Sequence, residues 1–463
     1  MKNQKGFTRR EFIKSVGIAS TGLMLAPSIL SKNSFARTIF SPYEFKAKVA
    51  VTKANNYDRN YVKQKVQYLF EQIGGIKDLF YNGKRVAIKI NLTGGSGSSF
   101  SSKLKGYSIQ EAMWTHPEVM RAAIELIIDS GVNPKDIFIV EALWDDASFN
   151  NFGYKEIKDN LGVNFIDLNK PDPYPDFIEK SVGENNFFYK SFKFNQILDE
   201  VDLFVSIPKL KHHYEAGFTG AIKNHVGIVP KQLYVLPNDN GRRGALHQEG
   251  GPSNTHLPKS ISDLFLACPI HLSIIDGIKN AIGGEGVWNP TFQPAQYNVL
   301  IAGKDAVAVD SVGASIMGRN PSNPKLVLPS GSECDNYLYM LNQKGMGINS
   351  INEIEIVGDG KDLITSVEHE INLPLLTEYQ LMPNFPNPFN PSTRIGFYLP
   401  KNDFVNLKVY DIAGREIETI IDKEISAGYH EVVFDAKNLS SGIYIYRILT
   451  HNFTDAKKMI LQK

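Results

Sequence analysis

The stretch from Arg85 to Glu141 decides the fold, because it reads as strand, helix and strand. Residues 85–90 read RVAIKI, residues 115–131 read THPEVMRAAIELIIDSG, and residues 137–141 read IFIVE. The two short runs are mostly apolar, which is typical of strands buried on both faces. The middle run has helical apolar spacing and opens with a capping box, Thr115 as the N-cap and Glu118 three residues later. We predict that this helix ends at Gly131.

The same alternation continues on both sides of this unit. Further strands are predicted at residues 48–54, 201–207, 272–276 and 297–302, and further helices at residues 60–73 and 306–317. Strands that alternate with helices favour an α/β fold, in which helices cover a mostly parallel sheet. We assign this domain to residues 46–371. In such sheets, functional groups gather beyond the carboxyl ends of the strands.

The last part of the chain has a different texture. The cluster NFPNPFNP at residues 384–391 is rich in proline and cannot continue a helix. Six short alternating runs follow between residues 393 and 461, separated by turn signals. This spacing predicts a small β-sandwich at residues 392–463, joined to the α/β domain by a linker at residues 372–391.

Composition excludes several classes of protein. Of the 463 residues, 42% are apolar and 21% charged, and two are cysteine, which excludes a disordered chain, a coiled coil and a small disulfide scaffold. Residues 1–36 hold six Lys or Arg and one acid, so the remaining chain has 44 basic and 48 acidic residues, a net charge of −4. A mildly acidic chain argues against nucleic-acid binding. No apolar run reaches the roughly 18–20 residues of a membrane span, so none is expected in the mature chain.

The N-terminus reads as an export signal. TRREFIK at residues 8–14 precedes a short apolar stretch at residues 16–30 and the small-residue site SFA at residues 34–36. These parts in this order are typical of a secretory signal, and the paired Arg9 and Arg10 resemble a twin-arginine signal over residues 1–36. The alternative is an N-terminal helix of the fold. The resemblance implies that the twin-arginine translocase carries the chain, already folded, into the periplasm.

The densest group of reactive side chains is PKLKHHYEAGFTGAIKNHVGIVPK at residues 208–231. It holds four lysines and three histidines against the single acid Glu215. We place Lys209 and Lys211 at or just past the end of the strand at 201–207, and Thr219 as the cap of a short helix at 220–225. This charge excess suits a small anion, and a crowded lysine can also lose its proton and act as a base or nucleophile. The alternative is a solvated basic loop.

We therefore predict two sets of site residues. The catalytic set is Lys211, His213 and Lys223. The ligand-binding set is Lys89, Asn91, Lys209, Thr219, Asn224, Asp276 and Glu285. No metal ligands are assigned.

A second candidate is the segment KINLTGGSGSS at residues 89–99, where a strand ends and a Gly/Ser loop begins. Successive backbone amides in such a loop can hold an anion, although a flexible surface loop fits the pattern equally well. Other strand ends and helix starts also carry polar groups: Glu141, Trp144, Asp145, Asp146, His116, Asp276, Asp305 and Asp310. Together they could bind a metal or transfer protons, but each also fits a helix cap or a turn.

Two cysteines are too few for an iron–sulfur cluster, so none is expected. Cys268 lies in an apolar stretch and is predicted to be a buried core residue. Its pairing with Cys334 stays open at this stage.

Several segments resemble the family catalogued as domain of unknown function 362, over roughly residues 48–320. They are VAIKINL, THPEVMRAAIELIIDSG, PKLKHHYEAGFTGAIKNHVG, LSIIDGI, GGEG and AGKDAVAVDSVGASIMG. The family motif Lys-x-Lys-Thr-His, then Thr-Gly-x-x-Lys-Asn, falls on Lys209, Lys211, His212 and His213, then on Thr219, Gly220, Lys223 and Asn224. His212 stands where the family has threonine. The resemblance implies a fold and a site, not a reaction. Many family members carry iron–sulfur clusters, which this chain lacks the cysteines to hold.

The last 80 or so residues resemble the C-terminal sorting domain of type IX secretion substrates. The resemblance rests on NFPNPFNPSTRI, VYDIAGREI, AGYHEVVFDAKNLSSGIYIYRI and KKMILQK, in that order. It implies recognition by the type IX secretion machinery, followed by release or anchoring at the cell surface. The alternative is a carbohydrate-binding or adhesive sandwich.

These observations favour an exported enzyme that holds a small anionic substrate or cofactor at the Lys/His-rich segment. The alternative is a non-catalytic ligand-binding protein of the periplasm or cell surface. Neither the substrate nor the reaction class can be read from these patterns.

Overall fold

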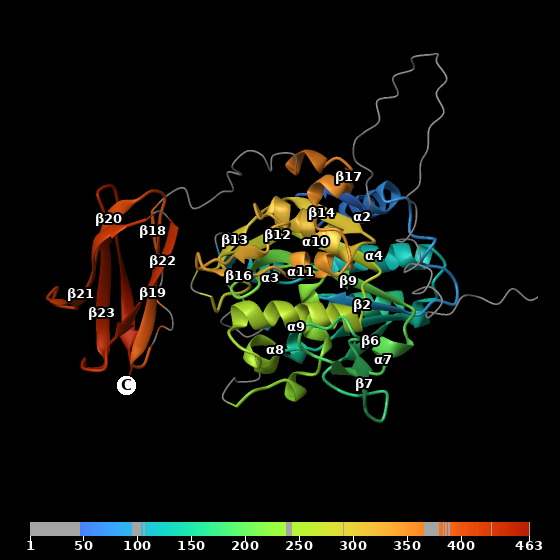
Figure 1. Cartoon of the computed structure of the whole chain (residues 1–463), viewed down its shortest axis with the longest axis horizontal. Helices are drawn as coiled ribbons and strands as arrows, with labels where there is room; N and C mark the ends of the chain where they lie inside the picture. The colour runs from blue at the N-terminus through green and yellow to red at the C-terminus, as the bar shows by residue number, and fades with distance from the viewer. Residues whose placement is uncertain are drawn as a thin grey trace, which may run out of the picture. The chain divides into compact units, whose positions relative to one another are not determined.

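The computed structural model describes residues 47–94, 103–104, 107–237, 243–289, 291–364 and 379–462, apart from 383, 385, 386, 388 and 427. Its centre is a long sheet wrapped by helices (Figure 1). The strand order is β17 (Ile354–Val357), β1 (Ala47–Lys53), β14 (Val299–Gly303), β12 (Leu272–Ile282), β9 (Leu203–Ile207), β2 (Val86–Ile90), β5 (Ile137–Glu141) and β6 (Asn164–Asp167).

Along this order one strand runs against the others. β14 pairs antiparallel with both β1 and β12, and the remaining neighbours in the order pair in parallel. The carboxyl ends of β9, β2 and β5 therefore meet at one edge, as the sequence pattern predicts. The α/β fold class, with a mostly parallel sheet covered by helices, is confirmed.

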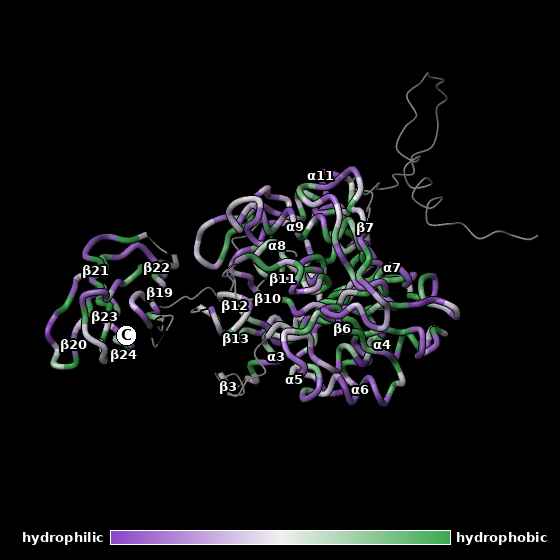
Figure 2. The backbone as a smooth tube through the Cα atoms, turned by 90° about the horizontal axis from the view of Figure 1, so that it is seen from below, coloured by the Kyte–Doolittle hydropathy of each residue, from purple (hydrophilic) through white to green (hydrophobic). Residues whose placement is uncertain are grey.

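Two apolar cores lie on the two faces of the sheet, because alternate strand residues point to opposite sides. Ala87 packs into one core with residues of α9 (Ser253–Ala267), α10 (Ala306–Ile316) and α11 (Tyr337–Gln343). Val86 and Ile88 pack into the other core with α2 (Arg59–Gln72), α3 (Ile109–Met113), α4 (Pro117–Asp129) and α6 (Tyr154–Leu161). Figure 2 shows α9 and α11 on one side and α4 and α6 on the other.

β10 (Lys209–His213) corrects the sequence analysis, which places Lys209 and Lys211 at or past a strand end. After Pro208 the chain continues as a strand, and β10 pairs in parallel with β12 and antiparallel with β11 (Gly217–Thr219). The partner β12 extends to Ile282 instead of ending at Asp276. The alternative of a solvated basic loop is wrong as well, because Lys209 and Lys211 are fully buried.

Two predicted helix caps are also wrong. α4 begins after His116, whose Nδ1 accepts the Glu118 amide, so His116 is the N-cap in place of Thr115. Thr219 ends β11 instead of capping a helix, and its buried hydroxyl has no hydrogen-bond partner among the described residues. The short helix that follows is a 3-10 helix, η3 (Lys223–Ile228).

Several elements are not predicted from the sequence. They include the sheet strands β6, β11 and β17, the hairpins β7 (Phe177–Ser181) with β8 (Ser191–Asn195) and β15 (Lys325–Val327) with β16 (Glu333–Asp335), the strand β13 (Gln293–Ala295), and the helices α3, α5 (Asp146–Asn150), α6, α7 (Ile197–Glu200), α8 (Gly244–Gln248), α9 and α11. The longest of them, α9, has Pro258 inside it, which hides the helix from a reading that treats proline as a helix breaker. Cys268 and Cys334 are both buried, and neither forms a disulfide within the described residues.

The C-terminal part is an antiparallel sandwich, as predicted. One sheet is β18 (Gln380–Leu381), β19 (Ser392–Leu399) and β22 (Gly428–Asp435). The other is β21 (Glu416–Ile425), β20 (Asp403–Asp411), β23 (Gly442–Leu449) and β24 (Thr454–Leu461). Alternating residues such as Val405, Leu407 and Val409 form its separate core.

Three predictions concern residues outside the described ranges. They are the leader at residues 1–36, most of the Gly/Ser loop at residues 95–99, and residues 372–378 of the linker. In the part of the chain that the structure does describe, no helix has the length and apolar character needed to cross a bilayer.

Candidate functional site

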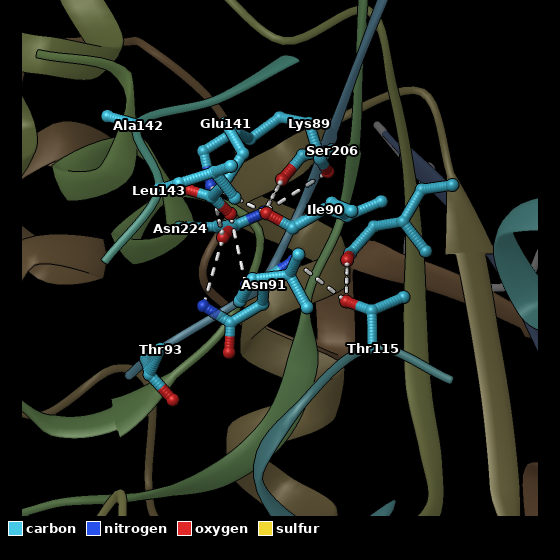
Figure 3. A network of polar contacts seen from close by, with 12 residues as sticks. Lys89, Ile90, Asn91, Thr93, Thr115, Glu141, Ala142, Leu143, Ser206 and Asn224 are labelled. Atoms are coloured by element: carbon cyan, nitrogen blue, oxygen red, sulfur yellow. Dashed lines mark hydrogen bonds and ion pairs between the residues drawn. The ribbon is translucent and has the colours of Figure 1, made fainter. Parts of the chain in front are cut away.

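A buried ion pair joins the ends of β2 and β5. Lys89 Nζ lies 2.8 Å from Glu141 Oε2, and both side chains are almost fully buried. The ammonium also donates to the Ile90 carbonyl at 2.5 Å and to Asn224 Oδ1 at 3.2 Å (Figure 3). Glu141 Oε2 accepts the Leu92 amide at 3.0 Å, so this oxygen has two donors. A charged pair can be buried only when its geometry is this complete.

Asn224 ties this pair to its surroundings. Its Oδ1 also accepts from Asn91 Nδ2 at 3.2 Å, and its Nδ2 donates to Ser206 Oγ at 3.2 Å. Figure 3 shows Asn224 between Lys89 and Asn91, with Ser206 beside it. The structure therefore brings three predicted ligand-binding residues, Lys89, Asn91 and Asn224, into one network. Most of their polar atoms are used within the protein, so these residues are positioned to support a site.

A second buried pair lies at the start of β10. Lys209 Nζ is 2.6 Å from Asp276 Oδ2, and neither side chain is exposed. Tyr57 donates to Asp276 Oδ1 at 2.8 Å and accepts from Lys209 Nζ at 2.8 Å. The ring of His116 stacks on Tyr57 with 3.7 Å between centroids, and the His116 amide donates to Asp276. Lys209 and Asp276 thus neutralise each other.

Lys211 has no carboxylate this close. Its ammonium donates to the Met113 carbonyl at 2.5 Å and lies 3.5 Å from Thr93 Oγ1. Burial lowers the pKa of Lys211 to about 7, Glu285 opposes that shift, and Lys223 adds to it. At neutral pH a large share of Lys211 is therefore the uncharged amine, which is the form that accepts a proton or attacks a carbon.

Lys223 is the least satisfied charge in the site. It is nine-tenths buried, and its ammonium makes no hydrogen bond or ion pair with any described residue. Burial lowers its pKa to about 8, with Glu285 and Glu215 favouring the charged form and Lys89 opposing it. The Lys223 nitrogen is not among the fully buried polar atoms without a partner, so the ammonium reaches solvent at the end of a mostly buried side chain, where an anion can approach it.

Glu285 is the carboxylate that electrostatically links Lys211 and Lys223. Its Oε1 accepts Trp288 Nε1 at 2.8 Å, and its Oε2 accepts Asn289 Nδ2 at 3.0 Å and the Tyr214 amide at 3.1 Å. Neutral donors therefore hold the carboxylate in place. It lies near both lysines without forming a direct ion pair with either.

The three histidines of the motif are neutral. Burial is the largest cause in each case: it lowers the pKa of His212 and His213 well below the usual value and that of His225 to about 3. His213 Nδ1 accepts the Glu215 and Ala216 amides at 3.2 Å each. In a neutral ring the hydrogen then sits on Nε2, so His213 is a hydrogen-bond donor.

Asp310 holds the turn that carries Lys223. From α10 its carboxylate accepts the Ala221 amide at 2.6 Å and the Ile222 amide at 3.0 Å. A Cβ on Gly220 would lie 2.4 Å from Asp310 Oδ1, so only glycine allows this approach. Burial raises the pKa of Asp310 to about 7, although the hydrogen bonds from the two amides favour the ionised carboxylate and oppose this rise. Asp305 caps the N-terminus of α10, and Asp145 caps that of α5, which is the helix-cap alternative given for these residues from the sequence.

Three residues of this region are missed by the sequence analysis, because no local motif marks them. Tyr57 lies between Lys209 and Asp276. Arg243 is buried, donates to the carbonyls of Val229 and Ala142, and has a left-handed φ of 57° that is unusual for a side chain of this size. His247 lies 2.6 Å from Glu215.

Neither described cavity is lined by Lys211 or Lys223. The larger, about 240 Å³, lies between Phe149, Phe165 and Lys155, and the smaller, about 100 Å³, is lined by Trp114, His116 and Glu111 among others. Within the described ranges, no group of three or more His, Cys, Asp or Glu side chains is arranged to hold a metal ion.

The comparisons with known proteins agree with the two-part organisation. Residues 86–315 match the family described as a domain of unknown function (DUF362). The chain carries a DUF362 domain. Residues 384–462 match the secretion system C-terminal sorting domain, which directs a chain through the type IX machinery to the cell surface or the medium. Both resemblances seen in the sequence are confirmed. The twin-arginine signal stays a prediction.

Two individual proteins give less information than the families. Thylakoid-associated protein sll1697 of Synechocystis sp. is 22% identical over 278 residues, which is 59% of this chain and 75% of that protein. The endo-beta-1,4-mannanase from Thermotoga petrophila covers 91% of this chain and 98% of its own at 9% identity, with a TM-score of 0.18. A TM-score this low supports no inference about fold or activity.

Proposed function

We propose that the DUF362 domain binds a small organic anion at Lys223 and acts on it by proton transfer. The observation that supports this most is Lys223, a residue that is nine-tenths buried and whose ammonium has no hydrogen-bond or ion-pair partner among the described residues. The two buried lysine–carboxylate pairs nearby are already neutral, through Glu141 and Asp276. A carboxylate or phosphate beside Lys223 would supply the missing negative charge.

The neighbours of Lys223 add chemistry to this binding site. Lys211, with its pKa lowered to about 7, supplies an amine that is partly uncharged at neutral pH. His213 supplies a neutral N–H donor, which suits an oxygen on which negative charge develops. Lys211, His213 and Lys223 are therefore our candidates for catalysis.

Isothermal titration calorimetry with inorganic phosphate, acetate and succinate at pH 7 tests the binding step. We expect at least one of these anions to bind, and Lys223→Met to weaken its binding at least tenfold, or about 1.4 kcal/mol. Lys325→Met is the matched control, because Lys325 is a half-exposed lysine paired with Asp335 on the β15–β16 hairpin. Equal binding by wild type and Lys223→Met would contradict the proposal.

A separate measurement addresses catalysis and cofactors. Native mass spectrometry and metal analysis of protein isolated from an exporting host would reveal a bound cofactor or ligand. Two results together would favour the alternative of a non-catalytic binding protein. Lys211→Met would leave ligand binding intact, and the wild type would not turn over the bound compound.

The export route forms the second part of the proposal. The sorting domain accounts for the last step, through the type IX machinery. We propose the twin-arginine translocase for the first step, from the Arg9–Arg10 pair, since that route carries folded chains and so permits a cofactor to be inserted beforehand.

A further inference from the structure

Glu215 makes different contacts with two histidines. Its backbone amide donates to His213 Nδ1 at 3.2 Å. Its carboxylate oxygen Oε2 lies 2.6 Å from His247 Nδ1. His213 belongs to β10 and His247 to α8, so one residue contacts both rings through its main chain and its side chain.

These contacts fix opposite hydrogen positions on the two rings. His213 Nδ1 accepts two amides, so its hydrogen is on Nε2. Burial raises the pKa of Glu215, but the hydrogen bond and charge of His247 outweigh it and bring the value to about 2, so the carboxylate is ionised. An ionised carboxylate only accepts, and His247 Nδ1 must therefore carry a hydrogen. When the His247 ring is neutral, its Nε2 has the free lone pair.

Both rings belong to the region of Lys223. After burial, the positive charge of Lys223 is the largest influence lowering the pKa of His213, and His247 and Lys211 contribute in the same direction. Glu215 in turn favours the charged form of Lys223. His213 is buried, whereas the His247 side chain is 22% exposed, so His247 can exchange protons with water.

We propose that Glu215 fixes the hydrogen positions of His213 and His247 so that the two rings act as an acid–base pair. His247 Nε2 accepts a proton from the bound anion, and His213 Nε2–H stabilises the charge left behind. This rests on the proposed anion site. It narrows the substrate to an anion with a weakly acidic hydrogen, for example a C–H beside a carbonyl group. The proton moves to His247 Nε2, the electron pair stays on the substrate as an oxyanion, and the Nδ1 hydrogen stays at Glu215.

Nitrogen-15 NMR of the full chain with labelled histidine tests the hydrogen positions directly. At a pH where the rings are neutral, we expect His213 to carry its hydrogen on Nε2 and His247 on Nδ1. Glu215→Gln keeps the backbone amide, so His213 should not change, whereas His247 should become a mixture because an amide can donate as well as accept. Glu355→Gln, in an exposed pair with Lys48, is the matched control. A His247 hydrogen on Nε2 in the wild type would overturn the proposal.

Diethyl pyrocarbonate provides a second readout, since it reacts with an unprotonated ring nitrogen. We expect His247 to react at least tenfold faster than His213, and inorganic phosphate to slow that reaction at least fivefold in the wild type but not in Lys223→Met. Phosphate that binds by calorimetry without protecting His247 would overturn this inference and leave the proposed function standing. Expected hydrogen positions in a chain that binds no anion would support the histidine pair and contradict the proposed function.

Discussion

Replacing Glu141 with glutamine should destabilise the α/β domain strongly. A glutamine side chain at this position keeps an oxygen for the Leu92 amide, so the main loss is the negative charge 2.8 Å from Lys89 Nζ. The Lys89 ammonium would then be buried with neutral acceptors alone, which are the new amide oxygen, the Ile90 carbonyl and Asn224 Oδ1. Breaking one side of a buried ion pair costs about 3–5 kcal/mol, and we expect a loss in this range.

Urea unfolding followed by tryptophan fluorescence measures this loss in the full chain. The three tryptophans, Trp114, Trp144 and Trp288, all lie in the α/β domain, so the fluorescence change reports unfolding of this domain and not of the C-terminal sandwich. Asp78→Asn removes one side of the exposed pair with Lys304, and it should cost about 0.2–1 kcal/mol. The double variant Lys89→Met with Glu141→Gln should recover most of the stability, because it leaves no unpaired charge.

A loss below about 1 kcal/mol for Glu141→Gln, equal to that of the surface control, would refute the argument. It would mean that water or a neutral Lys89 relieves the buried charge. Failure of the double variant to recover stability would show that packing around Lys89 matters more than its charge.

The remaining predictions concern Lys223, Gly227 and the two ends of the chain. The pKa of Lys223 in the folded chain, about 8, lies below the usual 10.5, so between pH 8 and 10.5 the folded chain binds fewer protons than the unfolded chain, and the free energy of unfolding rises with pH. In urea unfolding, Lys223→Met should lack this rise and should be more stable than the wild type below pH 8. Gly227→Ala should lose about 1–3 kcal/mol by the same assay, because the new Cβ would lie 2.6 Å from Glu141 Oε1 and 2.7 Å from Lys89 Nζ. The double change Arg9→Lys and Arg10→Lys should leave the protein in the cytoplasm by cell fractionation, and normal export would count against the twin-arginine assignment. Deleting the residues after Leu376 should leave the protein in the periplasm with an unchanged tryptophan unfolding curve.

The sheet is predictable because its strands are apolar without interruption. β2 and β5 read as strands from their own residues, and they keep the predicted boundaries to within one residue. β10 is missed for the opposite reason. Its sequence KLKHH resembles an exposed loop, since buried lysines are rare and depend on partners that the local sequence does not show.

The partners of these side chains come from distant parts of the chain. Lys209 is neutralised by Asp276, which is 67 residues away, and both bond to Tyr57. Strand-end reasoning points to Asp276 because it follows an apolar run, but Tyr57 and His247 lie outside any motif. Their place in the site depends on how loops and short helices pack, which periodicity does not encode.

The burial of the motif also affects how the protein survives outside the cell. A secreted chain meets proteases, and many of them cut after lysine or arginine in extended, accessible segments. Residues 208–225 contain three such positions, Lys209, Lys211 and Lys223, and all three are nine-tenths or more buried. This lysine-rich motif is therefore closed to trypsin-like enzymes while the fold is intact, and it becomes a cleavage point as soon as the sheet opens.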